Sequence, residues 1–274
     1  MLVSRKELLN LKLKSLKSED LKQLCNLENI NPKGTNSDLI KKLITIDGDK
    51  LDQFIKGKSK AQVENRRKLI SDHDLINELM RVDEFKWGVV QGQLDQKIQS
   101  EYVREFVRYQ DLVTNVTRNL HNDITNYVVA TWYNHWTTVL IEDHISQHPK
   151  VIPTLKNNFG VDIFFDEQPF DLKITYLPKS FTLEAAIDNP KSLIIWLYEN
   201  QGAQRFGFDN RLYVVVASKD SLDESWKLKR DFGFVYEKID NFFNQTTVSD
   251  KDEVVFSFNH NTYTTISKIL MITK

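Results

Sequence analysis

The sequence is poor in cysteine, proline and glycine, with one, six and nine of these residues among 274. The single cysteine, Cys25, excludes an internal disulfide and a zinc site built from cysteines, so a reducing, cytoplasmic location is expected. No apolar run is long enough to span a membrane, and residues 1–7 lack the apolar core of a secretory signal. We therefore expect a cytoplasmic protein without membrane contact, long enough for one large domain and an appendage.

The net charge of −1 is unevenly distributed along the chain. Residues 1–70 hold 16 Lys/Arg and 9 Asp/Glu, whereas the remaining 204 residues hold 21 and 29. A basic N-terminal segment followed by an acidic remainder favours an N-terminal segment that approaches phosphate, and a remainder in which some of the acids bind metal. A solvated, lysine-rich surface is the alternative explanation of the same excess.

Residues 161–176, which read VDIFFDEQPFDLKITY, carry the most specific functional pattern. Two apolar runs rich in β-branched and aromatic residues flank the turn-prone residues 166–169. This composition predicts a β-hairpin with a four-residue loop. The expected register pairs Phe165 with Phe170 across that loop.

Three charged side chains then share one face of the hairpin, because side chains alternate along a strand: Asp162, Asp171 and Lys173. In the expected register Asp162 lies opposite Lys173. Two carboxylates at such a separation can hold a divalent cation through hard oxygen ligands, and a nearby lysine can orient an anion or a water. The alternative is a surface hairpin with a cross-strand salt bridge between Asp162 and Lys173.

This pattern resembles the PD-(D/E)xK nuclease superfamily, in which an Asp opens one strand and an (Asp/Glu)-x-Lys motif follows on the next. Asp162 matches the first Asp, Asp171 the second acid and Lys173 the lysine, while Val161 stands where the name-giving proline would be. The resemblance implies Mg²⁺ as the cofactor, held by Asp162 and Asp171. Lys173 would position the attacking water or stabilise developing charge.

A long helix ended by Pro149 is predicted before the hairpin. In the superfamily this helix often lends an acid to the metal site, so the resemblance implies that Glu142, or its neighbour Asp143, is a third catalytic carboxylate. A solvated carboxylate near a helix end is the alternative. His144 and His148 have a spacing that can chelate zinc, but no third ligand accompanies them, so a surface pair is expected.

Residues 190–200 predict a helix, and residues 211–217 a strand buried on both faces. This is the order of elements in the superfamily core. The resemblance therefore implies an α/β fold, with a mixed sheet flanked by helices in a restriction-endonuclease-like core. Gln204 and Arg205 in the connecting segment, and Arg211 after it, are expected to contact DNA phosphate, although structural pairing with nearby acids is an equal alternative.

Residues 1–50 predict two short helices joined by a turn-rich loop, with Ser18 as the first N-cap and Asn36 or Ser37 as the second. Apolar positions and a loop glycine match those of a SAP domain, namely Leu16, Leu21, Leu24, Ile30, Gly34, Leu39, Ile40 and Leu43. The segment thus resembles this helical module, which binds duplex DNA. Phosphate contacts are expected from Lys17, Lys33, Lys41 and Lys42. A small helical docking domain is the alternative.

Residues 51–120 follow as a linker and helical region. The residues at 56–60 are expected to be the linker, and Arg66 and Arg67 to open a basic helix that extends the DNA-binding side. Apolar residues at helical spacing in the rest predict two or three helices that pack on the core or form a dimer surface.

The sequence is accordingly divided into a SAP-like helical module (1–50), a linker and helical region (51–120) and a nuclease domain (121–274). The two resemblances imply a Mg²⁺-dependent endonuclease for double-stranded DNA. It would be most similar to homodimeric type II restriction enzymes, with a cognate methyltransferase acting on the same site. The alternatives are an inactive DNA-binding or scaffolding protein, a junction-resolving or transposon-end nuclease, and a purely structural interaction protein.

Overall fold

The computed structural model describes residues 2–85, 96–155, 160–200, 210–258 and 260–274. Two compact units are present: Met1–Leu69 together with Ile141–Lys274, and Ile70–Leu140. This division differs from the boundaries at residues 50 and 120 derived from the sequence. The first 69 residues belong with the C-terminal half because their helices share a hydrophobic core with its first strands.

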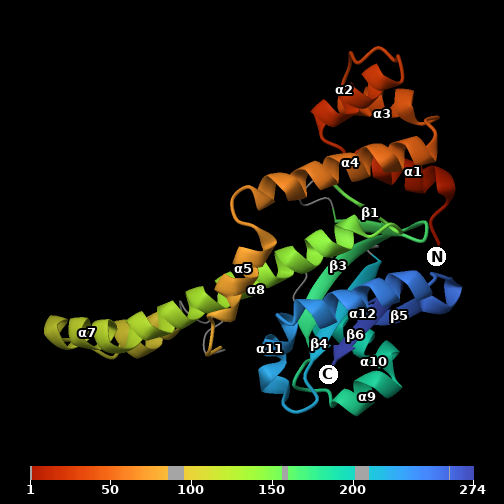
Figure 1. Ribbon diagram of the computed structural model, residues 1–274. Helices are drawn as coiled ribbons and strands as arrows, with labels where there is room; N and C mark the ends of the chain where they lie inside the picture. The colour runs from red at the N-terminus through yellow and green to blue at the C-terminus, as the bar shows by residue number, and fades with distance from the viewer. Residues whose placement is uncertain (1, 86–95, 156–159, 201–209, 259) are drawn as a thin grey trace. The chain divides into compact units, whose positions relative to one another are not determined.

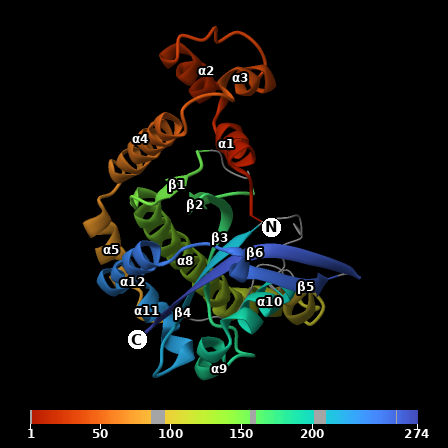
Figure 2. The same ribbon diagram turned by 90° about the vertical axis from the view of Figure 1, so that its right-hand side faces the viewer.

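A six-stranded mixed sheet in the order β1-β2-β3-β4-β6-β5 forms the centre of the first unit (Figures 1 and 2). Strands β1, β2 and β3 pair antiparallel, β3, β4 and β6 pair parallel, and β5 is antiparallel to β6. The predicted α/β class with a mixed sheet is confirmed. The strands are β1 (Val151–Pro153), β2 (Ile163–Phe165), β3 (Gln168–Tyr176), β4 (Arg211–Ala217), β5 (Glu253–Phe258) and β6 (Asn261–Thr273).

Strand β4 lies between two parallel neighbours, and all seven of its residues are buried. An apolar run without alternation is typical of a strand covered on both faces, and this prediction is confirmed. Tyr213 and Val215 belong to one hydrophobic cluster with Leu193 and Leu197 of helix α10. Because side chains alternate along a strand, the opposite face of the sheet is the one on which Phe165 contacts helix α12.

The helices of the first unit cover both faces of the sheet. Helix α12 packs Phe243 edge-on against Phe165, with ring centroids 4.9 Å apart. Helix α10 begins at Pro190, as predicted, and α8 ends two residues before Pro149. Over the described residues, no helix combines the length and apolarity needed to cross a membrane. The helices are α1 (Arg5–Lys14), α2 (Ser18–Leu27), α3 (Asn36–Leu43), α4 (Gly48–Arg67), α9 (Leu183–Asp188), α10 (Pro190–Asn200), α11 (Ser225–Lys229), α12 (Phe232–Gln245) and the end of α8 (His121–Gln147).

The N-terminal helices pack onto the antiparallel edge of the sheet. In both views α1 and α4 lie between the pair α2 and α3 and the strands β1 and β2 (Figures 1 and 2). Leucines of all four helices form one core with Ile152 of β1 and Phe164 of β2. Phe164 alternates with Ile163 and Phe165, so it points to the opposite face of the hairpin. The N-terminal helices therefore cover part of the face that carries the predicted catalytic residues.

Both predicted N-caps in this region are wrong by one or two residues. The N-cap of α2 is Lys17, without a side-chain bond, and Ser18 is already helical. Helix α3 is capped by Thr35, whose hydroxyl accepts from the Asp38 N–H while the Asp38 carboxylate accepts from the Thr35 N–H. This reciprocal capping box satisfies two orphan backbone donors, which a single cap at Asn36 would not do.

The predicted linker at residues 56–60 is also wrong, because these residues lie inside the 20-residue helix α4. Buried residues of α4 recur at four-residue spacing, at Leu51, Ile55, Ser59 and Val63. Burial of that face outweighs the loss of about 1 kcal/mol caused by one internal glycine. Arg66 and Arg67 consequently end a helix rather than begin one.

The elements of the second unit that the structure describes are helices. Within it the Lys97 ammonium contacts the Asp123 carboxylate at 2.6 Å, and the rings of Phe85 and Tyr133 meet edge-on at 5.3 Å. These contacts join the segment before residue 104 to α8. The elements are α5 (Asp72–Met80), the π-helix η1 (Ile98–Val103), α7 (Tyr109–Asn115), the π-helix η2 (Val116–Leu120) and the first part of α8.

Replacement of Phe164 by alanine tests the contact between the N-terminal helices and the hairpin. Phe164 is almost fully buried, so Phe164→Ala should lower the free energy of unfolding by about 3–5 kcal/mol through lost burial and a residual cavity. Urea denaturation followed by circular dichroism measures the change. Leu27→Ala, at an exposed leucine of α2, is the control, and an equally small loss in both variants would contradict the packing.

Candidate active site

The turn between β2 and β3 has two residues, not four. Asp166 and Glu167 both take positive φ, at 48° and 60°, as the tight turns that match the twist of a hairpin require. Phe165 therefore pairs with Gln168, and the predicted pairing of Phe165 with Phe170 is wrong. The register differs by two residues, and an even shift leaves every side chain on its predicted face.

Asp162 lies directly before β2, beside Asp171 and not opposite Lys173 as predicted. Its backbone N–H donates to the carbonyl oxygen of Phe170 at 2.9 Å, and its Oδ2 accepts from the Leu172 N–H at 2.8 Å. Partial burial raises the pKa of Asp162 to about 6; the Leu172 bond opposes the rise, whereas the hydrogen bond and charge of Asp171 add to it. The residue remains exposed to solvent, so ions and water can reach it.

Asp171 on β3 is held between two cations. Its Oδ1 accepts from the Lys173 ammonium at 2.8 Å, and its Oδ2 lies 3.4 Å from Nε of Arg211. The Asp171 side chain is 14% exposed, whereas that of Lys173 is 40% exposed. Lys173 therefore contacts a nearly buried carboxylate while its own side chain stays accessible to solvent.

Arg211 pairs with an acid, and its side chain is only 3% exposed. The guanidinium lies 4.7 Å above the ring of Tyr198, and Nη1 is 3.4 Å from the hydroxyl of Tyr213. Its buried Nε makes no hydrogen bond within the described residues and lies 3.4 Å from the Asp171 carboxylate. Of the two roles expected for Arg211, the structure shows the structural pairing.

Glu142, near the end of α8, lies within electrostatic range of the hairpin acids. Desolvation, followed by the charges of Asp162 and Asp143, raises the pKa of Glu142 to about 7, against the opposing effect of Lys229 and Lys173. The residue as a whole keeps solvent access. Asp143, its alternative, is instead engaged by Arg66, whose Nε and Nη2 lie 3.0 and 2.6 Å from one carboxylate oxygen.

A further lysine, Lys229 at the end of α11, was not identified from the sequence. It is 3% exposed, and its Nζ lies 5.5 Å from the ring centre of Tyr176. Burial lowers the pKa of Lys229 to about 7, while the charge of Glu142 acts in the opposite direction. The basic run at residues 227–230 was visible in the sequence, but nothing local distinguished its buried member.

The two histidines of α8 are not a surface pair. His148 is buried against Phe243, with ring centroids 5.3 Å apart. His144 stacks on Tyr236 at 4.0 Å and places Nε2 2.8 Å from Asp240. Both imidazoles contact side chains of α12. Their four-residue spacing places them on the same side of α8, the side that packs against α12.

The fit of a divalent cation rests on the carboxylate pair. Throughout the part of the chain that the structure describes, no three His, Cys, Asp or Glu side chains converge as metal ligands do. Asp162 nevertheless lies next to Asp171 across the hairpin, and the charge of Asp171 adds to the raised pKa of Asp162, because two nearby negative charges repel unless a proton or a cation lies between them. Hard oxygen donors in such a pair fit Mg²⁺, and Glu142 supplies further negative charge.

The predicted phosphate-binding lysines of the N-terminal module are all exposed. Lys17 precedes α2, Lys33 lies in the loop and Lys41 lies on α3. The ammonium of Lys42 donates to the carbonyl oxygens of Asn31 and Lys33, at 3.1 and 2.7 Å. Lys42 therefore also braces the loop that separates α2 from α3.

The remaining predicted DNA contacts divide into two groups. Arg66 is largely buried in its ion pair with Asp143, so it is poorly placed to reach phosphate, whereas Arg67 is exposed. Gln204 and Arg205 lie outside the described residues. The exposed members of the predicted set are thus concentrated in the first 70 residues.

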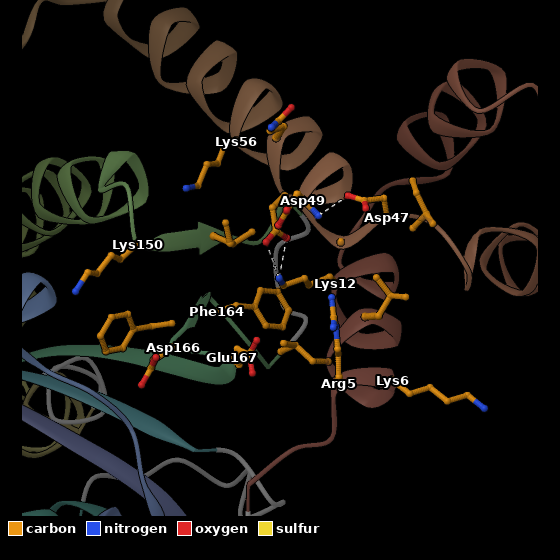
Figure 3. Close-up of a pocket in the computed structure, with 18 of the residues that line it drawn as sticks. Arg5, Lys6, Lys12, Asp47, Asp49, Lys56, Lys150, Phe164, Asp166 and Glu167 are labelled. Atoms are coloured by element: carbon orange, nitrogen blue, oxygen red, sulfur yellow. Dashed lines mark hydrogen bonds and ion pairs between the residues drawn. The ribbon is translucent and has the colours of Figure 1, made fainter.

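A cavity of about 1070 Å³ lies between α1, α4 and the hairpin turn (Figure 3). Five basic and five acidic residues line it, including Lys12, which pairs with Asp52 at 2.7 Å. Phe164 and Glu167 contribute to its wall, but Asp162, Asp171 and Lys173 do not. Because the charges lining the cavity balance, the cavity shows no preference for a polyanion. The cavity is separate from the carboxylates Asp162 and Asp171.

Comparisons of the chain with protein-family models, with curated proteins and with solved structures found no match. The chemistry of the site therefore supplies the argument for function. That chemistry consists of two adjacent carboxylates, a third acid with a raised pKa, and a solvent-accessible lysine.

The raised pKa of Asp162 predicts that this carboxyl lowers the free energy of unfolding at high pH. Folded protein binds more protons than unfolded protein between the ordinary pKa of 3.8 and about 6, so this carboxyl increasingly destabilises the fold as the pH rises through that window. Asp162→Asn should therefore stabilise the metal-free protein at pH 8, on the order of 1 kcal/mol because solvent screens the site, and leave stability at pH 4 unchanged.

Urea titrations of both proteins at the two pH values measure this effect. Asp223→Asn, at an exposed aspartate, is the control and should change nothing at either pH. A variant less stable than the parent at pH 8 would show that Asp162 is not under electrostatic strain.

Proposed function

We propose that this protein is a Mg²⁺-dependent endonuclease that hydrolyses phosphodiester bonds in double-stranded DNA. The observation that carries the proposal is the pair of neighbouring carboxylates, Asp162 and Asp171, with the Lys173 ammonium 2.8 Å from Asp171. Crowded carboxylates beside a lysine at the start of a sheet are costly to maintain, and a role in binding a cation offsets that cost.

The order of elements supports the same proposal. Helix α8 is followed by the antiparallel strands β1, β2 and β3, then by α9, α10 and β4, which pairs parallel with β3. This is the order that the resemblance to PD-(D/E)xK nucleases implies. Asp162 lies directly before β2, and Asp171 and Lys173 follow on β3, which is the arrangement that the resemblance implies.

In the proposed mechanism, Asp162 and Asp171 would hold the cation, and Glu142 would add negative charge on the side of α8. Mg²⁺ bound there would polarise the scissile phosphate and favour ionisation of a water. The chain's own contribution is to keep both carboxylates in place: the Leu172 N–H fixes Asp162, and Arg211 fixes Asp171. Lys173 can orient the attacking water or stabilise charge that develops on the phosphate.

The N-terminal module is proposed to hold the duplex. Its exposed lysines lie on a segment with a net positive charge, and ammonium groups give DNA affinity that is blind to sequence and weakened by salt. A homodimer would present two such modules and two sites, one for each strand. Site-specific cleavage, with a cognate methyltransferase protecting the same site, is the restriction-type form of this proposal.

A second candidate is a DNA-binding protein that has lost catalysis. It is favoured by the absence, among the described residues, of a third side chain in ligand position beside Asp162 and Asp171. A junction-resolving or transposon-end nuclease would share the proposed chemistry and differ in the shape of its substrate.

Lys173→Ala separates the enzyme from the inactive binder. If Lys173 acts in the chemical step, the variant should cleave supercoiled plasmid at least about 100-fold more slowly in Mg²⁺, while its affinity for DNA in Ca²⁺ changes little. Lys179→Ala, at a fully solvated lysine beyond β3, is the matched control and should cleave normally. Undiminished cleavage by Lys173→Ala, or a parent protein that never cuts with Mg²⁺, would exclude the proposed mechanism.

The role of the module is tested by removing two of its exposed lysines together. Lys33→Ala/Lys41→Ala should weaken binding to any duplex and reduce the slope of log affinity against log salt by about 1 to 2. Fluorescence anisotropy with unrelated duplexes across a salt series measures both quantities. The double variant Lys219→Ala/Lys251→Ala removes the same charge from exposed positions in the C-terminal half; an equal loss there would assign the effect to net charge alone.

A further inference from the structure

Exposed apolar side chains are concentrated in one part of the second unit. Among the described residues, fifteen large hydrophobic side chains are exposed, and eight of them lie in the segment 103–132. Scattered exposed apolar residues are normal on soluble proteins, but a concentrated patch marks an interaction surface. The segment also supplies the two most exposed apolar side chains of its unit, Val107 and Tyr109.

These residues recur with helical spacing. On α8, Ile124, Val128 and Trp132 are exposed at intervals of four residues, and on α7 Tyr109 and Val113 repeat the same interval. Residues four apart lie on one side of a helix. We refer to these five residues as the apolar stripe. The helices follow one another directly, joined by the π-helix η2, a type of segment that is common at functional sites.

The charge around the apolar stripe restricts its partner. Residues 121–141 contain a single Asp, Glu, Lys or Arg, namely Asp123, although 27% of the chain is charged. Asp123 is itself paired with Lys97 at 2.6 Å. Such a surface offers nothing to the phosphates of DNA or to a partner of strong charge. It is complementary to itself, because two copies can face each other without repulsion, and interface centres are depleted of charge and rich in aromatic residues.

We propose that a second copy of this chain docks on the apolar stripe, in an isologous contact to which each copy contributes the same residues. From Tyr109 to Trp132 the helical path is about 36 Å long and about 10–12 Å wide. One face therefore presents roughly 400 Å² in projection, to which the exposed Val103 and Val107 add, and a stable dimer buries about 800 Å² per partner.

The inference rests on the proposed function in one respect, since cleavage of both strands of a duplex needs two copies of the site. Dimerisation is measured without DNA or metal, so the two proposals fail separately. If the protein is a dimer that does not cut DNA, the proposed interface stands and the proposed nuclease function is wrong. If it is a monomer that cuts DNA, only the proposed interface is wrong.

The decisive experiment compares Val128→Glu with Val255→Glu by analytical ultracentrifugation of the full chain over a concentration series. The two valines are 55% and 51% exposed, but Val255 lies on β5, far along the chain from the apolar stripe. A charge buried at an apolar contact is strongly unfavourable. Val128→Glu should weaken the dimer at least about tenfold, while Val255→Glu should behave as the parent. A monomeric parent, or a Val128→Glu dimer of unchanged affinity, overturns the proposal.

Substitution of the same valines by cysteine, which adds no charge, tests the interface with less risk of misfolding than substitution by glutamate. The only native cysteine, Cys25, is fully buried, so Val128→Cys and Val255→Cys each create one accessible thiol. Maleimide labelling of Val128→Cys should slow markedly as the protein concentration rises through the dimer midpoint, whereas labelling of Val255→Cys should keep a constant rate. Equal, concentration-independent rates at both positions would place the contact elsewhere, including on a different protein.

Discussion

The repulsion between two carboxylates at the end of one hairpin is the constraint on which the proposed site depends. Asp162 and Asp171 are held together by backbone bonds of β2 and β3, and the fold compensates with Lys173 on one oxygen and the buried Arg211 facing the other. Burial and proximity leave Asp162 with a raised pKa. In the proposed function, a divalent ion at this site would remove the repulsion between the two carboxylates.

The N-terminal helices have two roles in this arrangement. Their leucines form one core with Ile152 and Phe164, so they stabilise the hairpin from the face that carries Asp171 and Lys173. The same segment carries the exposed lysines that would hold a duplex. Because the same helices bind the hairpin and present the lysines, the proposed DNA-binding module and the proposed site belong to one compact unit.

Some elements could be predicted because their signals are local. The buried run of β4, the proline at the start of α10 and the proline after α8 each fix a boundary through the physics of one or two residues. The linker at 56–60 failed because burial of one face of α4 outweighs a single glycine. The hairpin loop failed because Asp166 and Glu167 accept left-handed conformations that their residue types only weakly suggest.

The local sequence pattern is enough to predict which side chains share a face: alternation along a strand places Asp171 with Lys173, and an error of two residues in the register does not change that. The distant groups around these side chains depend on how the strands and helices pack. Arg211 reaches Asp171 because β4 pairs parallel with β3, and Glu142 and Lys229 approach from helices far apart in the chain. The strand period is a property of the backbone, whereas these neighbours depend on sheet order and helix packing, which no local pattern encodes.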